Sequence, residues 1–197
     1  MRSAIKTKDR IVHAAMELFH LNGIKGTSVD DILKRSKTGK GQFTHYFKNK
    51  DGLVLAVVAY LQELIRSGQV DSNYSIKSWK DFNTWFKRYI NFQKITEYEL
   101  SCPLGTIGND LTEEQTHLRL AVKTFFEWST EQLAIFFTER KAAGDLPSSV
   151  SPAQLADLCM CVMEGGMLMT KICRSSKAFE NAASQVIVYI KMLRRYS

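Results

Sequence analysis

The sequence has few residues that interrupt helices and no segment long enough to cross a membrane. Its 197 residues include only three prolines, so long stretches are free to be helical. The apolar runs at 53–61 and 159–163 are too short to span a bilayer, and the N-terminus lacks the apolar core of a signal peptide. We therefore expect a cytoplasmic protein with one large or two small domains.

The sequence also lacks a metal-binding or redox motif. No C-x-x-C or C-x-x-C-H pattern occurs, and Cys159 and Cys161 would point to different sides of a helix. His13 and His20 are too far apart on one helix to share a metal ion without further ligands. We predict no metal and no cofactor, and we expect the four cysteines to be buried, reduced thiols.

No catalytic or nucleotide-binding pattern stands out. Gly39, Lys40 and Gly41 lack the spacing of a Walker loop or of a dinucleotide fingerprint, and no strand pattern precedes them. A catalytic site would have to be assembled by folding from residues without a recognisable motif. Candidates for such a site are Glu97, Glu99, Cys102 and His117. We therefore predict that the protein is not an enzyme.

The net charge of +7 is confined to the first quarter of the chain. Residues 1–50 hold 11 Lys and Arg against 4 Asp and Glu, whereas residues 51–197 hold 16 of each kind. A solvated basic face is one interpretation. Such one-ended asymmetry is more typical of a module that binds a polyanion and is attached to a neutral domain.

The spacing of apolar and capping residues at the beginning of the chain predicts two helices separated by a short loop. Apolar residues at i, i+3, i+4 and i+7 place the first helix from about Thr7 to Asn22, where an Asn-Gly pair would end it. After a short loop, Ser28 and Asp31 have the spacing of a capping box at the start of the second helix.

A third helix is expected over residues 39–46, with Thr38 as its N-cap, and Asn49 would cap a fourth. Residues 7–47 thus contain three helices, the last two joined by a tight turn. This is the spacing of a helix-turn-helix.

The stretch SKTGKGQFTHYF, residues 36–47, contains no acidic residue. Phe43 and Phe47 are four apart and would face the core. Gly41 would let the helix approach a surface closely, and Lys40 adds positive charge at a helix start whose amides already favour phosphate. The side chains left on the other faces are Gln42, Thr44, His45 and Tyr46. Glutamine can pair with adenine, and threonine can hydrogen-bond a base or pack on a thymine methyl group. We interpret this helix as one that reads DNA; the alternative is a small helical cap with a solvated face.

From residue 68 onward the pattern stays helical, which predicts an all-α fold. Helices are expected at 79–95, 106–110, 113–143, 152–174 and 179–195. The last two carry apolar residues over wide arcs. Gly165 and Gly166, in the middle of the penultimate helix, would permit close approach of another helix.

This second part of the chain is rich in large apolar side chains. Each is best explained singly as core, but together they would line a pocket between helices. Cys102 stands beside Pro103 at a helix break and is the cysteine that would sense oxidants or electrophiles, unless it is a buried thiol beside the pocket. The pocket candidates are Trp79, Phe82, Trp85, Phe86, Tyr89, Cys102, Phe125, Trp128 and Met163.

The order and spacing of the first helices resemble the DNA-binding domain of TetR-family transcriptional regulators. The resemblance extends in register over about residues 7–55, and weaker likeness is found at 101–105 and 143–146. The residues that carry it are Ile11, Ala15, Leu18, Phe19, Gly23, Thr27, Ser28, Val29, Ile32, the run Lys40–Phe47 and residues 50–53.

The resemblance implies particular contacts with DNA. Residues expected to touch the DNA backbone are Thr27, Ser28, Lys40, Tyr46 and Lys50, and those expected to face the groove and the bases are Gln42, Thr44 and His45. The family usually has tyrosine in place of Thr44, which leaves the contact of Thr44 open. It often has glycine in place of Lys37, which predicts a different turn or a lysine in left-handed geometry.

The resemblance also implies a division into a helix-turn-helix DNA-binding domain, 1–48, and a helical ligand-binding and dimerisation domain, 49–197. A homodimer formed through the last two helices would bind a pseudo-palindromic operator in double-stranded DNA. We predict a repressor that is released by a small, largely apolar effector. The alternatives are a ligand-independent DNA-binding dimer and an enzyme with a helical catalytic pocket. Effector, operator and target genes are not specified by the sequence.

Overall fold

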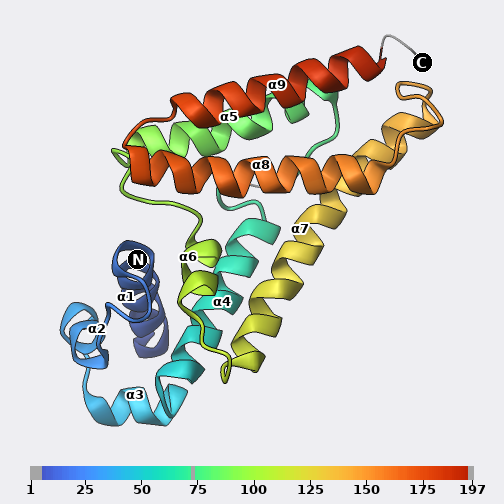
Figure 1. The fold of residues 1–197 in the computed structure, drawn as a ribbon. Coiled ribbons are helices and arrows are strands. Elements are labelled where there is room, and N and C mark those ends of the chain that lie inside the picture. The colour runs from blue at the N-terminus through green and yellow to red at the C-terminus, as the bar shows by residue number, and fades with distance from the viewer. Residues whose placement is uncertain (1–5, 72–73, 195–197) are drawn as a thin grey trace, which may run out of the picture. The chain divides into compact units, whose positions relative to one another are not determined.

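The computed structural model describes residues 6–71 and 74–194, and all regular secondary structure in these residues is α-helical (Figure 1). The predicted all-α fold is confirmed. The chain forms two compact units: the first comprises the described residues up to Leu64 together with Pro103–Thr124, and the second those of Ile65–Cys102 and Phe125–Ser197. None of the described helices is both long and apolar enough to cross a bilayer. The predicted functional boundary between residues 48 and 49 stays a prediction.

The N-terminal part of the first unit contains α1 (Thr7–Asn22), α2 (Val29–Ser36) and α3 (Lys40–Phe47). α1 begins and ends as predicted, with Gly23 after its last residue at a φ of 74°. α1 packs against both α2 and α3. The stripe that α1 buries follows helical spacing and consists of Ile11, Val12, Ala14, Ala15 and Phe19.

The start of α2 is fixed by the predicted capping box. The amide of Asp31 donates to Ser28 Oγ at 3.1 Å, and the amide of Ser28 donates to Asp31 Oδ2 at 3.0 Å. These bonds satisfy backbone donors that a helix start leaves without partners. They also stabilise the ionised carboxylate, so the Ser28 side chain and then its amide lower the pKa of Asp31.

The turn between α2 and α3 contains the left-handed lysine that the sequence predicts. Lys37 has φ 53° and ψ 51° and forms the C-cap of α2. Its carbonyl oxygen accepts a hydrogen bond from Arg10 Nη2 at 2.8 Å, which ties the turn to α1. The predicted N-cap of α3 is wrong by one residue, because Gly39 takes that position and the Thr38 hydroxyl instead bonds Ser36 Oγ at 2.7 Å.

Three further helices contribute to the first unit: α4 (Lys50–Arg66), α6 (Pro103–Asp110) and the first part of α7 (Thr116–Ala142). The predicted cap of α4 is confirmed, since Asn49 Oδ1 accepts a hydrogen bond from the amide of Gly52 at 2.9 Å. Beside this cap, Gln115 Nε2 donates to Asp51 Oδ1 at 2.8 Å, which joins the start of α4 to the segment before α7.

α6 begins three residues earlier than predicted, at Pro103 rather than Thr106. Proline is tolerated at the first helical position because its missing N–H would have no partner there. At the other end of α6, Asp110 Oδ2 accepts a hydrogen bond from the amide of Lys25 at 3.2 Å. The same carboxylate lies beside Gly23, whose positive φ is a conformation that favours glycine.

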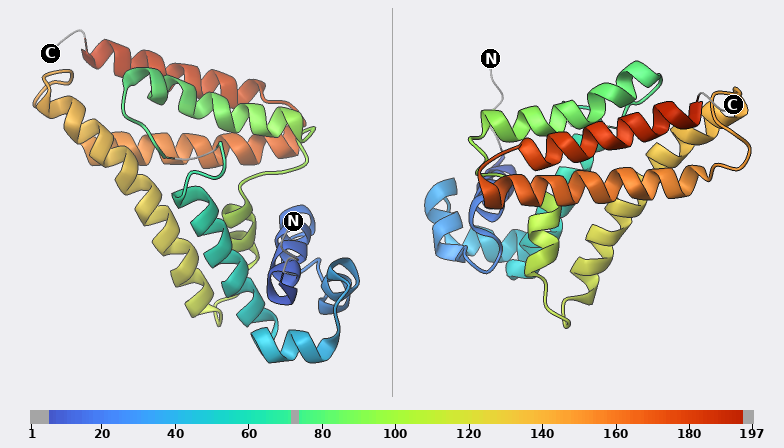
Figure 2. Two further views of the ribbon diagram at one scale, coloured as in Figure 1. Left: turned by 180° about the vertical axis from the view of Figure 1, so that it is seen from behind. Right: turned by 45° about the horizontal axis from the view of Figure 1, so that its top comes forward.

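The second unit is built from α5 (Trp79–Ile95), the last part of α7, α8 (Pro152–Cys173) and α9 (Lys177–Arg194). α5, α8 and α9 lie side by side in all views (Figures 1 and 2). α9 starts two residues before the predicted Phe179, and its predicted end at residue 195 lies outside the described residues.

Gly166 lets α8 and α9 come close together, as the sequence suggested for this glycine. A Cβ at Gly166 would lie 2.2 Å from a ring carbon of Phe179, which is itself fully buried. Gly165 differs, because no atom lies within 4 Å of the place where its Cβ would be. The two adjacent glycines therefore form a matched pair, one in a packed interface and one in open space.

Gly166→Ala is expected to lower the free energy of unfolding by about 1–3 kcal/mol, because the added methyl group must displace the Phe179 ring. Gly165→Ala is expected to raise it by up to about 1 kcal/mol through helix propensity. Denaturant unfolding of both variants at equal protein concentration measures the difference. Equal stability of the two variants would contradict the packing of Phe179 on Gly166.

Candidate functional site

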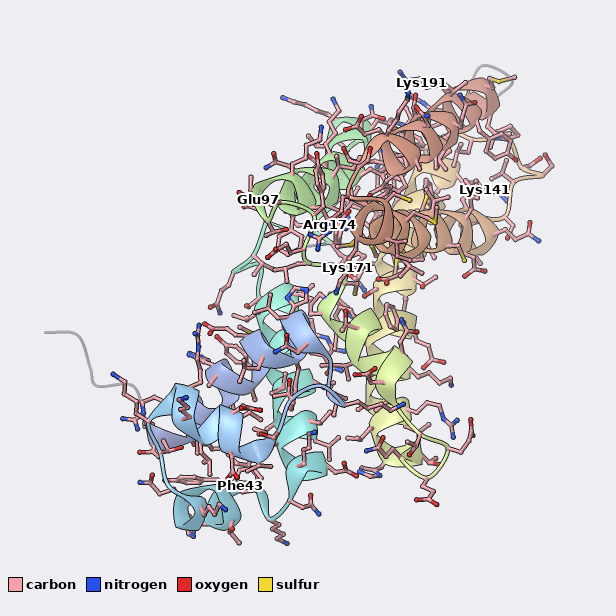
Figure 3. The ribbon with its side chains drawn as sticks, turned by 60° about the vertical axis from the view of Figure 1, so that its left-hand side comes forward. Phe43, Glu97, Lys141, Lys171, Arg174 and Lys191 are labelled. Atoms are coloured by element: carbon pink, nitrogen blue, oxygen red, sulfur yellow. The ribbon has the colours of Figure 1, made fainter. Side chains whose placement is uncertain are left out.

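α3 has a buried face and an exposed face. Phe43 and Phe47 are 6% and 5% exposed, and Phe43 lies on the side of α3 that faces the other helices of the unit (Figure 3). The predicted inward orientation of these two side chains is confirmed. The exposed side chains of α3 are Lys40, Gln42, Thr44, His45 and Tyr46. The structure thus brings five of the predicted DNA contacts together on one short helix.

The exposed side chains of α3 are held only by weak contacts. Lys40 Nζ lies 3.4 Å from Asp30 Oδ1, with both side chains about three-quarters exposed, and such pairs contribute little to stability. Gln42 Oε1 accepts a hydrogen bond of 3.3 Å from the amide of Gly39. No atom lies within 4 Å of the place of a Cβ on Gly41. A duplex can therefore approach this backbone closely, and both polar side chains are able to turn toward it.

The other three predicted DNA contacts have structural roles within the first unit. Thr27 is 1% exposed, and its hydroxyl donates to the carbonyl of Gly23 at 2.8 Å. Ser28 caps α2, and Lys50 Nζ donates to the carbonyl of Ile24 at 2.6 Å. This placement does not favour a phosphate contact by the buried Thr27 side chain. Contacts of Ser28 and Lys50 with DNA stay predictions.

Two basic residues near the ends of α3 were not among the predicted contacts. Lys37 precedes α3 and Lys48 follows it, and both are exposed. Lys48 has a positive φ of 65° and donates its amide to the Thr44 carbonyl at 3.1 Å, which ends the helix. With Lys40 they surround the exposed face of α3 with positive charge. The excess of positive charge in residues 1–50 was the feature of the sequence that could have pointed to these two lysines.

The predicted pocket residues of the second unit fall into two aromatic groups. In the first, the Trp79 ring lies 5.2 Å from Phe136, and Phe82 lies 5.3 Å from Phe137. Trp79 Nε1 donates to Asp145 Oδ2 at 2.9 Å, so the polar atom of this group has a partner. Trp79 is only half-buried, whereas Phe82, Phe136 and Phe137 are buried. This group is apolar core, and nothing about it indicates a ligand.

The second aromatic group surrounds Tyr74, which the sequence analysis did not single out. The Tyr74 ring lies 5.7 Å from Trp85 and 5.5 Å from Trp128, and Trp85 lies 5.2 Å from Tyr89. Phe125 adds a contact with Trp128 at 5.8 Å. Phe86 links the group to α9 through Phe179. All of these rings are buried except Trp128, which is half-buried.

Polar groups are buried within this second group. We define the polar cluster as Tyr74, Trp85, Tyr89, Cys102, Ser129 and Glu164. The Tyr74 hydroxyl donates to Met160 Sδ at 3.6 Å, and the hydroxyls of Tyr74 and Tyr89 are hydrogen-bonded to each other. The Cys102 thiol is hydrogen-bonded to the Glu164 carboxyl. Residues from α5, α7, α8 and the segments before α5 and α6 thus meet at one place.

Three atoms of the polar cluster are buried and have no hydrogen bond of standard geometry: Trp85 Nε1, Ser129 Oγ and Glu164 Oε1. The Ser129 hydroxyl lies near enough to the Tyr74 hydroxyl to lower the pKa of Tyr74, but the two groups do not form a hydrogen bond of standard geometry. Glu164 is partly exposed as a residue, whereas its Oε1 has no access to solvent. Each buried polar group without a partner costs about 1–3 kcal/mol.

Burial sets the protonation of the cluster. It raises the pKa of Glu164 from 4.5 to about 7, and the hydrogen bond from Cys102 opposes this rise only in part. Burial also raises the pKa of Tyr74 and of Tyr89 well above the ordinary value of 10. Glu164 therefore holds its proton over much of the range in which surface carboxyls have lost theirs.

Sequence reasoning found Trp85, Tyr89 and Cys102 but missed the other members of the cluster. Glu164 follows Met160 by one helical turn, and Met160 is buried, so an acid on the apolar arc of α8 was the available signal. Ser129 and Tyr74 carried no such signal. The remaining pocket candidate, Met163, is buried on α8.

A separate groove runs between α5 and α9. Its volume is about 640 Å³, and its floor includes Phe86 and Ile90. Lys94 and Glu180 line it and form an ion pair of 2.6 Å with each other, which neutralises part of its rim. Of the predicted pocket residues only Phe86 lines this groove.

The cysteine prediction is half wrong. Cys102 and Cys159 are buried, but Cys161 and Cys173 are exposed. The contrast between Cys159 and Cys161 agrees with their expected placement on different sides of one helix. Among the described residues, no three His, Cys, Asp or Glu side chains come together in a way that would hold a metal ion.

The residues considered for a catalytic site lie in different surroundings. His117 belongs to the first unit, where its Nε2 is 3.8 Å from Asp51 Oδ2. In the second unit, Arg174 Nη1 donates to the Glu97 carbonyl at 3.4 Å and lies 4.0 Å from Glu99 Oε1. Figure 3 shows Glu97 and Arg174, which come from the end of α5 and the end of α8.

Comparison with known proteins agrees with this architecture. Residues 11–57 match the family model described as bacterial regulatory proteins, tetR family. Residues 82–186 match the model described as tetracyclin repressor-like, C-terminal domain, and this match alone covers more than half of the chain. The chain belongs to the TetR family. It is therefore a DNA-binding transcriptional regulator and not an enzyme.

TetR-family relatives match along most of their length. The chain is 25% identical to the transcriptional regulator AcuR of Cereibacter sphaeroides over 173 residues, which are 82% of this chain and 75% of AcuR. It is 24% identical over 182 residues to IcaR of Staphylococcus aureus (strain Newman), the negative transcriptional regulator of the biofilm operon icaADBC. That match covers 90% of this chain and 91% of IcaR.

Solved structures of TetR-family proteins share the fold. The crystal structure of a TetR transcriptional regulator from Chloroflexus aurantiacus J-10-FL superposes with a TM-score of 0.81 and covers 97% of each chain. Its sequence identity of 22% is low enough that the likeness supports the fold alone.

Glu164→Gln is expected to stabilise this TetR-family protein at alkaline pH. Between pH 4.5 and about 7 the folded protein keeps a proton on Glu164 that the unfolded chain has released. The wild-type fold therefore loses up to about 3 kcal/mol from this group as pH rises through that window, and glutamine avoids the loss. Denaturant unfolding at pH 5 and pH 8 measures the difference.

Asp157→Asn is the matched control, because it removes an exposed carboxylate from the same helix. It is expected to leave the pH dependence unchanged. If Glu164→Gln altered stability equally at both pH values, the buried state of the Glu164 carboxyl would be refuted.

Proposed function

We propose that the chain is a ligand-responsive repressor that binds a pseudo-palindromic operator as a homodimer in the cytoplasm. One α3 enters the major groove at each half-site, and a small effector with a largely apolar body binds the second unit and releases the DNA. In this proposal residues 1–48 bind DNA, and residues 49–197 bind the effector and form the dimer.

The observation that carries the proposal is the two-faced α3. Its apolar residues, Phe43 and Phe47, are buried, while its polar residues are exposed together with an open glycine backbone at Gly41. Phosphate contacts from the lysines around α3 would supply affinity that depends on salt, and Gln42, Thr44 and His45 would supply base choice. We propose repression of transcription rather than activation because a relative, IcaR, is named a negative regulator.

Dimer formation is supported by exposed apolar side chains on both of the last two helices. On α8 the exposed side chains Leu168, Met169 and Ile172 lie within about one turn of each other, and Gly165 precedes them with open space around it. On α9 the exposed apolar side chains are Val188, Tyr189 and Met192. A two-fold axis through this surface would bury the same residues from both protomers.

The effector acts by preferring one of two dimer states. A ligand shifts an equilibrium only by its difference in affinity for the two states, and the coupling needed is typically about 1–3 kcal/mol. α4 and α7 each begin in the first unit and end in the second, so they are the proposed carriers of this coupling.

Gln42→Ala is expected to relax sequence choice, and Lys40→Ala to weaken binding to all sequences. Loss of a bidentate base contact costs about 1–3 kcal/mol of discrimination, which lowers preference at that base roughly 5- to 150-fold. Loss of one phosphate contact per protomer makes the slope of log affinity against log salt shallower by about 2 for the dimer. An operator selected from a random duplex library with the wild-type protein provides the probe.

Lys80→Ala, which removes an exposed lysine from α5, is the control and should leave both measurements unchanged. Binding that is unaltered in both Gln42→Ala and Lys40→Ala would show that α3 does not read the operator.

Leu168→Glu combined with Ile172→Glu is expected to yield monomers, because the interface would bring buried like charges together. Light scattering after size-exclusion chromatography should give the chain mass of 22.5 kDa for the variant and twice that mass for the wild type. Leu120→Glu, at an exposed leucine of α7, is the control and should remain dimeric. A double variant that keeps the wild-type mass would exclude this surface as the interface.

A further inference from the structure

The polar cluster of the second unit is poorly matched to a ligand that is purely apolar. Trp85 Nε1, Ser129 Oγ and Glu164 Oε1 are buried without partners, and an apolar ligand would leave them so. Polar groups in a binding site select ligands that satisfy them and reject those that do not. The effector of the proposed function must therefore carry a polar group as well as an apolar body.

The charge of that polar group follows from the surroundings of Glu164. The Cys102 thiol lowers the pKa of the Glu164 carboxyl through a hydrogen bond, and no lysine or arginine among the described residues acts on that carboxyl. Tyr74 and Tyr89, the other titratable members of the cluster, are influenced by Cys102 and Glu164 and again by no cation. Glu164 is thus a buried acid that lacks a positive partner within the described protein.

Three cations of the second unit are engaged with other groups. Lys141 Nζ donates to the Val150 carbonyl at 2.8 Å, and Arg174 Nη1 donates to the Glu97 carbonyl at 3.4 Å; both cations are labelled in Figure 3. Arg66 lies over the Trp128 ring, 4.9 Å from its centroid, and does not shift the pKa of Glu164.

The aromatic group that contains Tyr74 and Tyr89, the two tyrosines within electrostatic reach of Glu164, favours the same sign of charge. Tyr74 lies within 5.7 Å of both Trp85 and Trp128, and Tyr89 adds a further ring beside Trp85. Aromatic faces attract cations, most strongly where water is excluded. A carboxyl group and several aromatic rings therefore converge on one buried place, and an anionic ligand would be repelled by both.

We propose that the polar cluster binds a protonated amine, with the ammonium group paired to Glu164 and the apolar body of the ligand against Tyr74, Trp85 and Trp128. This proposal rests on the proposed function and specifies the chemical class of the effector. An oxygen acceptor on the same ligand would satisfy Trp85 Nε1, one of the two donors that remain without a partner beside Ser129 Oγ.

Amine binding has a signature that other ligands lack. At pH 6 the empty Glu164 holds its proton, since its pKa is raised to about 7. Pairing with an ammonium group favours the carboxylate, so about one proton per protomer is released at pH 6 and almost none at pH 8.5. Tyr74 and Tyr89 keep their protons over this range, because burial holds the pKa of both tyrosines high.

The test uses the full chain and three probes of one shape: benzylamine, benzyl alcohol and benzoate. Isothermal titration in buffers of different ionisation enthalpy measures both affinity and proton release. Benzylamine is expected to bind with a roughly millimolar or tighter Kd, at least tenfold tighter than benzyl alcohol, and benzoate to show no binding. Glu164→Gln should weaken benzylamine about tenfold or more, leave benzyl alcohol unchanged and abolish the proton release.

Asp157→Asn is the control and should bind all three probes as the wild type does. The proposal is overturned if benzylamine does not bind at roughly 10 mM, if either other probe binds as tightly, or if Glu164→Gln retains full benzylamine affinity. Operator binding is measured separately. Benzylamine that binds through Glu164 without releasing DNA would support the amine site and contradict the ligand-responsive repressor, so the two failures are distinguishable.

Discussion

Burial of Phe43 and Phe47 is the constraint on which the proposed DNA-reading surface depends. A helix of eight residues such as α3 is not stable alone, because too few hydrogen bonds form to offset the ordering of the chain. α3 is held by its apolar face, and the same contacts decide which residues face outward. The exposure of Gln42 and His45 is therefore a consequence of core packing, and a substitution at either phenylalanine would disturb both stability and recognition.

The turn before α3 is a second constraint of the same kind. Lys37 adopts a left-handed conformation that favours glycine, at a strain of about 1–2 kcal/mol. The strain is tolerated because the chain is fixed on both sides of α2. The capping box at Ser28 fixes its start, and the C-cap at Lys37 and the Arg10 hydrogen bond fix its end. A lysine there adds positive charge beside α3. The departure from glycine is thus compatible with DNA binding and contributes to the charge around α3.

Features set by neighbouring residues were predictable from the sequence, whereas contacts between residues far apart in the sequence were not. The capping box at Ser28, the end of α1 and the inward phenylalanines follow from spacing within a few residues, and the structure agrees with each. The burial of Thr27 was missed because it depends on the backbone of α1. The meeting of Tyr74 with Glu164 was missed because the two lie in segments about 90 residues apart, and no single-helix pattern encodes that proximity.

The two aromatic groups of the second unit differ in whether their buried polar atoms have hydrogen-bond partners. The one indole N–H of the group around Phe82 has a partner in Asp145, while the group around Tyr74 contains buried atoms without partners. Those atoms lower a net stability that is only about 5–15 kcal/mol in a typical domain. A ligand that satisfies them recovers free energy of about 1–3 kcal/mol per group, which is the size of coupling that allosteric release requires. Buried polar atoms without partners are therefore a physical source for the proposed ligand response.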